Sequence, residues 1–255
     1  MTGKTYKTKG IVLRKTKLGE KDLIVTMLDE SGSLRRAVAK GARKPGGSYA
    51  ARLELFSIAD VMCAEGKSLD VITSAKLAPG SAQAGFGIEQ SACASGLAEL
   101  LSLVAQEDLP HDRLYLMACA AFREIAGSDA RNALKLTCSA LLKTFAYTGF
   151  RPSFHNCVSC GEPAIADVDS HVMFSIADGG SYCTSCSRPS DCIRVEAETI
   201  RWSDALMRSR FEDVVTYDAS LQTLFAVLQL LQQWSRVHVG KNLKSLDFIF
   251  SSGLF

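Results

Sequence analysis

The 255-residue chain has little of what marks a membrane or a secreted protein. It contains no run of about 18 apolar residues, the length that a membrane-spanning helix needs. Its first ten residues, MTGKTYKTKG, are polar and basic and lack the apolar segment of a secretory signal. We therefore expect a cytoplasmic protein with no membrane partner, whose nine cysteines stay reduced.

Patterns typical of catalysis and of nucleotide binding are also scarce. None of the four histidines stands beside a nucleophile in a recognisable arrangement. Gly66-Lys67-Ser68 resembles the end of a phosphate-binding loop, but Val61 occupies the position of that loop's first glycine, and a strand follows instead of a helix. The sequence therefore favours a binding protein over an enzyme.

Positive charge is distributed unevenly along the chain. Residues 1–80 hold fifteen basic and eight acidic side chains, a net charge of +7, whereas the remainder carries −5. This asymmetry points to a polyanionic partner for the first 80 residues. Only Tyr6, Tyr49 and Phe56 are aromatic there, so bases have few side chains to stack on, and contacts with the phosphate backbone should dominate.

The basic residues bunch where the first expected strand ends and where the third leads into a Gly-Pro loop. Solvation of the surface alone is the alternative explanation for them. If they converge on one face, that face would bind single- or double-stranded nucleic acid in a salt-sensitive way and with little sequence preference. The candidate nucleic-acid-binding residues are Arg14, Lys15, Lys17, Arg35, Arg36, Lys40, Arg43 and Lys44.

Short runs rich in β-branched residues, separated by turn signals, predict five strands in the first 80 residues. These runs are 10–14, 23–29, 34–40, 56–64 and 69–75. Hairpin turns at 30–33 and 65–68 and a longer Gly and Pro loop at 41–48 fit a five-stranded OB barrel, an architecture that commonly binds oligonucleotides.

Beyond a linker at 79–87, apolar residues recur with a helical period. Helices are expected at 89–106, 111–126, 130–147, 197–211 and 219–238, with a short final element at 243–250. Asp129 is the expected N-cap of the third helix, and Gly149 its stop. The predicted fold class is α+β multidomain, with an OB barrel at 1–80 and a helical bundle at 81–255 that carries an insertion at about 151–194.

The insertion contains two C-x-x-C pairs separated by 22 residues, with a hairpin expected between them around 177–180. This layout is typical of a zinc ribbon, and four thiolates would fill the coordination shell of one structural zinc per chain. A redox dithiol, an iron site and disulfides are the alternatives, but two matched pairs around a hairpin fit a metal better. The candidate metal ligands are Cys157, Cys160, Cys183 and Cys186.

These features together resemble the RecO family of bacterial DNA repair and recombination mediators. The matching segments are GIVL at 10–13, GEKD at 19–22, AKGAR at 39–43 and GKNLKSL at 240–246, and the order of barrel, helices and four-cysteine insertion matches along the whole chain. The resemblance assigns DNA contacts to Lys40 and Arg43 of the AKGAR segment and to their basic neighbours.

The resemblance also implies a function. Such a protein is not an enzyme; it binds single- and double-stranded DNA without ATP, anneals complementary strands, and acts with RecR to help load RecA onto strands coated with single-strand-binding protein. It recognises that coat through the coat protein's acidic C-terminal tail, and it works at the nucleoid in the bacterial cytoplasm. An RNA-binding or transcription-associated protein with an OB barrel and a zinc ribbon is the rival interpretation.

Overall fold

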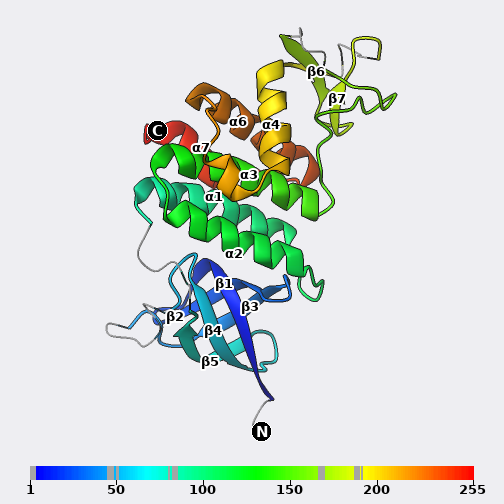
Figure 1. Ribbon diagram of the computed structural model, residues 1–255. Helices are drawn as coiled ribbons and strands as arrows, with labels where there is room; N and C mark the ends of the chain where they lie inside the picture. Colours follow the sequence, from blue (N-terminus) through cyan, green and yellow to red (C-terminus); the bar gives the residue numbers. More distant parts are fainter. Residues whose placement is uncertain are drawn as a thin grey trace. The chain divides into compact units, whose positions relative to one another are not determined.

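The computed structural model describes residues 4–44, 49, 52–79, 81, 86–165, 170–186, 190 and 192–255, and Figure 1 shows its strands and helices. The chain divides into two compact units. The first comprises Met1–Gly87 and Leu97–Gly127, and the second comprises Ile88–Gly96 and Ser128–Phe255. In the described part of the chain, no helix combines the length and the apolar character needed to cross a bilayer.

Five strands of the first unit close into a barrel, as the sequence predicted. They are β1 (Thr5–Leu18), β2 (Asp22–Asp29), β3 (Leu34–Ala39), β4 (Ile58–Ala64) and β5 (Asp70–Leu77). Their order around the barrel is β1-β2-β3-β5-β4, in which only β3 and β5 run parallel. Alternate residues point inward: Val25, Met27, Ala37 and Ala39 are at most 2% exposed. This topology is that of a five-stranded OB-like barrel.

Strand β1 extends over 14 residues, whereas the sequence indicated a strand only at 10–14. Its first half is polar, but every second side chain still points into the barrel. Tyr6 pairs with Cys63 and Thr8 pairs with Val61, and Cys63 and Val61 are both core residues. The lysines between them take the outer side, so the alternation holds without an apolar run.

The first unit also contains α2 (Asp112–Ala126), which the sequence assigned to a separate helical bundle. The segment before α2 lies against the β2–β3 turn, because the His111 N–H donates to the Ser31 carbonyl at 2.6 Å. Gly32 permits this approach: a Cβ there would lie 2.0 Å from the His111 carbonyl oxygen. The rings of Phe56 and Phe122 stack at 5.5 Å and join the barrel to α2.

The second unit is mostly helical. Its helices are the first half of α1 (Ile88–Val104) together with α3 (Ala130–Tyr147), α4 (Ala197–Arg208), α5 (Phe211–Val214), α6 (Leu221–His238) and α7 (Lys244–Ser252). Helix α3 has the expected bounds, and Asp129 caps it by accepting a hydrogen bond from the Asn132 N–H at 2.8 Å. The single turn of α5 was not expected, since four residues show no helical period.

A small sheet follows α3 and precedes α4. Its strands are β6 (His171–Ser175), β7 (Gly180–Tyr182) and β8 (Ile193–Glu196), in the order β7-β6-β8. Strands β6 and β7 form the hairpin expected between the two cysteine pairs. Strand β8 was not predicted. It consists of the residues just after Cys192, which pair with β6 on the side opposite β7, so the sheet of the ribbon has three strands.

Candidate nucleic-acid interface and metal centre

A row of cations crosses the outer face formed by β1, β2 and β3. Val25 and Met27 lie in the core, so Thr26 between them faces outward. Thr26 pairs with Arg14 on one side and with Arg36 on the other, and residues paired in this way share a face. Because neighbouring strands are about 4.8 Å apart, the backbones at the two arginines are about 10 Å apart. Lys40 continues the outward alternation just beyond β3 and is exposed.

A second group of cations gathers at the end of the barrel where β1 turns into β2. The Arg43 guanidinium donates through Nη1 to the carbonyl oxygens of Gly19 at 2.9 Å and Glu20 at 2.8 Å. The Arg43 N–H donates to the Lys21 carbonyl at 3.0 Å. The β1–β2 turn and the segment after β3 therefore lie side by side. The exposed lysines of these two segments are Lys17, Lys21, Lys40 and Lys44.

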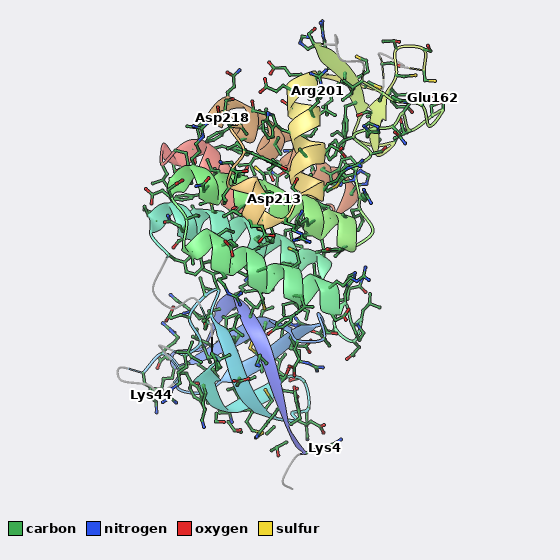
Figure 2. All side chains as sticks on the ribbon, in the orientation of Figure 1. Lys4, Lys44, Glu162, Arg201, Asp213 and Asp218 are labelled. Atoms are coloured by element: carbon green, nitrogen blue, oxygen red, sulfur yellow. The ribbon has the colours of Figure 1, made fainter. Side chains whose placement is uncertain are left out.

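These four lysines have no ion-pair partner among the residues that the structure describes. Figure 2 shows Lys44 on the flank of the barrel, away from Lys4 at the start of β1. Lys21 was not among the candidates from the sequence, although its place in the GEKD turn could have indicated it. The OB architecture commonly binds oligonucleotides on strands 2 and 3 and on the loop between strands 1 and 2; Arg36 lies on β3, Lys21 lies in the β1–β2 loop, and the other cations flank these surfaces on β1 and just after β3.

Arg35 has a different environment from its neighbour Arg36. It pairs with Met27 of the core, so its side chain starts on the inner side of β3. Its Nε lies 2.5 Å from Oδ2 of Asp29, whose side chain is only 4% exposed. The guanidinium also covers the ring of Tyr6, with 5.7 Å from Cζ to the ring centroid. Arg35 thus compensates a buried carboxylate within the barrel.

Lys15 and Arg36 form ion pairs of a weaker kind. Lys15 Nζ lies 2.8 Å from Glu54, and Arg36 Nη2 lies 2.7 Å from Glu107. The side chains of Arg36 and Glu107 are both about half exposed. Exposed pairs of this sort contribute about 0–1 kcal/mol, so a phosphate group can replace the carboxylate at little cost. The DNA contacts of all eight candidate residues remain a prediction.

We expect Arg35→Ala to destabilise the barrel by about 1–3 kcal/mol, because it leaves the buried Asp29 carboxylate without its cation. Arg36→Ala should cost no more than about 0.5 kcal/mol, since its ion pair is exposed. Chemical denaturation of the two single variants, followed by circular dichroism, measures both values. Equal losses of stability would contradict this distinction between neighbouring arginines.

The four predicted cysteines lie together in the ribbon. Their sulfur atoms are all within 4.8 Å of one another. The Sγ atoms of Cys160 and Cys183 are 3.8 Å apart, far more than the bond of about 2.05 Å in a disulfide. A tetrahedral metal with metal–sulfur bonds of about 2.3 Å has sulfur–sulfur edges of about 3.8 Å. The donor set and its spacing therefore fit a four-thiolate metal ion.

Local backbone structure prepares these sulfurs for a cation. Burial disfavours the thiolate of Cys157, but the backbone N–H groups of Cys183, Cys160 and Ser159 favour it more strongly and lower its pKa to about 6. The hydrogen bond between the Cys186 thiol and the Cys183 sulfur raises the pKa of Cys186, because it favours the protonated form of Cys186. A bound dication would stabilise the thiolate form of the cysteines in the cluster.

The ribbon is anchored to α6 by aromatic packing and hydrogen bonds. The rings of Phe154 and Phe174 stack at 5.8 Å, and Phe174 meets Trp234 of α6 at 6.0 Å. Trp234 Nε1 donates to the Phe150 carbonyl at 2.9 Å. His238 Nε2 lies 2.7 Å from the Ile176 carbonyl oxygen. A metal in the cysteine cluster would therefore stabilise a module that is fixed to the helices of its own unit.

Two protein-family models match the chain. The one described as "Recombination protein O N terminal" matches residues 1–80, which include the barrel, and "Recombination protein O C terminal" matches residues 86–247, which include the cysteine cluster. The chain belongs to the RecO family. It is similar to the protein named DNA repair protein RecO of Nocardioides sp., with 32% identity over 96% of this chain and 98% of that relative.

Other RecO relatives give the same result. The protein named DNA repair protein RecO of Bifidobacterium longum is 32% identical over 96% of this chain and 99% of its own length. The protein of the same name from Frankia casuarinae is 29% identical over 96% of this chain and 98% of its own length. The family resemblance seen in the sequence is thus confirmed, and this RecO-family chain is a DNA repair protein.

Proposed function

We propose that this RecO-family protein is a recombination mediator that binds single- and double-stranded DNA and anneals complementary strands without ATP. The observation that carries the proposal is the row of Arg14, Arg36 and Lys40 on the outer face of the barrel, next to the lysines at the β1–β2 turn. This arrangement offers several cations to one stretch of phosphate backbone. Displacement of counterions from that backbone supplies the affinity.

The surface reads little of the base sequence. Between the two arginines of the row lies Thr26, and the next outward row contains Thr16, Ile24 and Val38. None of these side chains is aromatic, so bases cannot stack on them as they do on other OB barrels. Binding therefore depends on charge and on the spacing of phosphates, which suits a protein that must act on any damaged sequence.

Annealing follows from the same cations. Two DNA strands repel each other because both carry a negative charge at every phosphate. A cationic surface that holds one strand lowers this repulsion for a second strand and raises its local concentration. No proton transfer or bond cleavage is involved, and we propose no catalytic residues.

We further propose that Cys157, Cys160, Cys183 and Cys186 hold one zinc ion per chain. When bound, zinc supplies a structural crosslink between the two cysteine pairs, since four thiolates fill its shell. In this proposal the helical unit meets protein partners, namely RecR and the acidic C-terminal tail of single-strand-binding protein. The protein would then help RecA load onto coated strands at the bacterial nucleoid.

An annealing assay tests this function. Complementary oligonucleotides should anneal several-fold faster with the protein than without it, both bare and coated with single-strand-binding protein, and with no added ATP. The acceleration should fall steeply as salt rises, because charge screening and counterion competition weaken the contacts. The measurement is a stopped-flow fluorescence titration. No acceleration at low salt, or the same acceleration at all salt concentrations, would refute the proposal.

A further inference from the structure

The sheet of the ribbon ends in a strand that has free backbone groups. In the order β7-β6-β8, strand β8 pairs with β6 and has no second partner strand among the residues that the structure describes. The Ala197 N–H donates to the Ser170 carbonyl at 2.9 Å, which fixes the alternation of hydrogen bonds between β8 and β6. Every second residue of β8 bonds to β6, whereas Arg194 and Glu196 direct their N–H groups to the other side. These N–H groups and the Arg194 carbonyl have no partner in the described part of the chain.

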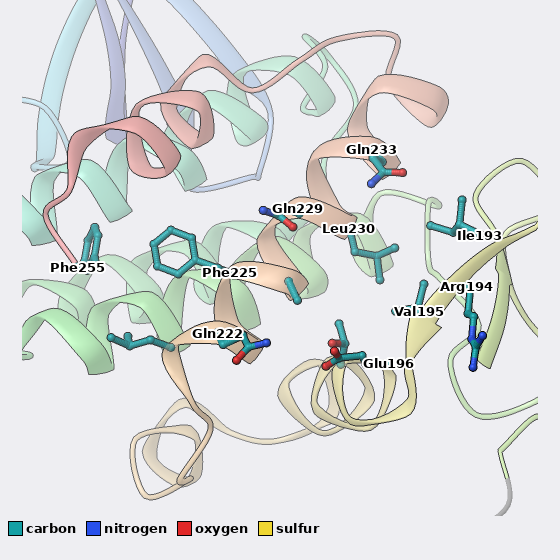
Figure 3. A pocket seen from close by; sticks show the side chains of 13 residues that line it. Ile193, Arg194, Val195, Glu196, Gln222, Phe225, Gln229, Leu230, Gln233 and Phe255 are labelled. Atoms are coloured by element: carbon teal, nitrogen blue, oxygen red, sulfur yellow. The ribbon is translucent and has the colours of Figure 1, made fainter. Parts of the chain in front are cut away.

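A groove of 480 Å³ follows this free edge. All four residues of β8 line it, although successive side chains of a strand point to opposite faces. The groove must therefore run along the edge of the strand. Helix α6 forms the facing wall, and Figure 3 shows Phe225, Gln229 and Gln233 of that helix across the groove from Ile193 and Val195.

The groove combines apolar surface with side-chain amides. Ile193 is 38% exposed and Leu221 is 39% exposed, unusually high fractions for large apolar residues that line a cavity. Gln222, Gln229 and Gln233 lie along one side of α6 and present amide groups that both donate and accept hydrogen bonds. The two walls thus offer apolar contacts together with polar groups that match a peptide backbone.

We propose that this groove binds an extended peptide segment of a partner protein, which adds to the ribbon sheet as a further strand beside β8. Every second residue of the segment is apolar and faces the groove. On the opposite side of the sheet, the peptide has an acidic residue beside Arg194 and, two positions away, a basic residue beside Glu196. The proposal does not depend on DNA binding by the barrel.

The chemistry of the groove disfavours other occupants. Arg194 and Glu196 are the charged residues that line it and they cancel, so it offers no net attraction to a phosphate backbone. An edge of four residues spans about 13 Å. Pairing of two such edges from two copies of the chain would bury much less than the roughly 1,200 Å² of a stable interface.

Selection of a phage-displayed library of random nine-residue peptides against the full chain tests the proposal. Enriched sequences should have apolar residues at every second position and opposite charges two positions apart. One such peptide is then synthesised with an N-methyl group at each position in turn. Methylation should lower affinity by about tenfold or more at alternate positions, where the N–H bonds to β8, and have little effect between them.

Two variants at one position provide the matched comparison. Arg194→Pro removes a free N–H but keeps the bonds to β6, and it should lower peptide affinity by about tenfold or more. Arg194→Ala keeps the N–H and should lower affinity by no more than about threefold. An unchanged zinc content and an unchanged melting temperature would show that both variants fold. The proposal fails if folded Arg194→Pro binds the peptide normally, if N-methylation shows no alternation, or if selection enriches no such pattern.

Experiments with competing ligands distinguish a bound peptide from the other possible occupants of the groove. An oligonucleotide that displaces the selected peptide and loses its own binding in Arg194→Pro would identify the groove as a nucleic-acid site instead. A dimer of the chain that Arg194→Pro dissociates would identify it as an interface between copies. Either result would overturn the peptide assignment, while DNA binding by the barrel would be unaffected.

Discussion

Replacement of Arg14, Arg36 and Lys40 together with glutamate should lower the affinity for a single-stranded oligonucleotide by at least about 100-fold at about 50 mM salt. Each lost phosphate contact also removes about 0.7 from the slope of log K against log salt concentration, so the slope should fall by about 2. These residues are exposed on the outer face, and the fold should remain intact. Fluorescence anisotropy across a salt series measures both quantities.

A second triple variant controls for net charge. Lys7, Lys9 and Lys76 also face outward, but they lie where β1 pairs with β4 and where β4 pairs with β5, outside the paired rows of β1, β2 and β3 that contain Arg14 and Arg36. Their replacement with glutamate changes the charge of the chain by the same amount, and we expect less than about a fivefold loss of affinity. Equal losses in both variants would mean that total charge, and not the β1–β2–β3 face, determines binding.

Cys160→Ser should abolish stoichiometric zinc binding, from one ion per chain to less than about a tenth. The ribbon should then unfold locally, because binding of a structural zinc supplies about 10 kcal/mol or more toward folding. Elemental analysis gives the metal content, and hydrogen exchange of β6 and β7 reports the loss of structure. In a Trp202→Phe background, the emission of Trp234 should also shift, since Trp234 contacts Phe174 of the ribbon.

Cys192→Ser is the matched control for that experiment. Cys192 is also a free cysteine of the ribbon region, but it lies outside the four-sulfur cluster. This variant should retain one zinc ion and normal protection of β6 and β7. Full zinc content in Cys160→Ser would refute the four-thiolate site, and loss of zinc in Cys192→Ser would mean that the ligand set is different.

The strands, the helices and the cysteine site could be predicted because each depends on local sequence. The β-branched-rich runs of the barrel strands, the helical period of α3 and the C-x-x-C spacing are all short-range patterns. Strand β8 and helix α5 escaped prediction because four residues are too few to show a period. The grouping of α2 with the barrel depends on contacts between distant segments, such as Phe56 with Phe122.

The faces of the basic residues could not be predicted for a related reason. A bulge between Val12 and Arg14 inserts an extra residue into β1 and reverses the alternation beyond it. Without the bulge, Lys15 would face outward and Arg14 inward. The structure has the opposite arrangement, with Lys15 paired with the core residue Val25. A count of charges along the sequence cannot distinguish these two arrangements, because a shift of one residue exchanges the faces.

The anchoring of Arg43 has a consequence for the energetics of binding. A guanidinium has five N–H groups, and Nη1 provides the bonds to the Gly19 and Glu20 carbonyls, which leaves those on Nε and Nη2 for a ligand. One side chain can thus hold two loops in place and still meet a phosphate. Because these bonds already fix Arg43 against the β1–β2 turn, the proposed binding of DNA at this turn would cost little conformational entropy, and less of the interaction free energy would be lost to ordering.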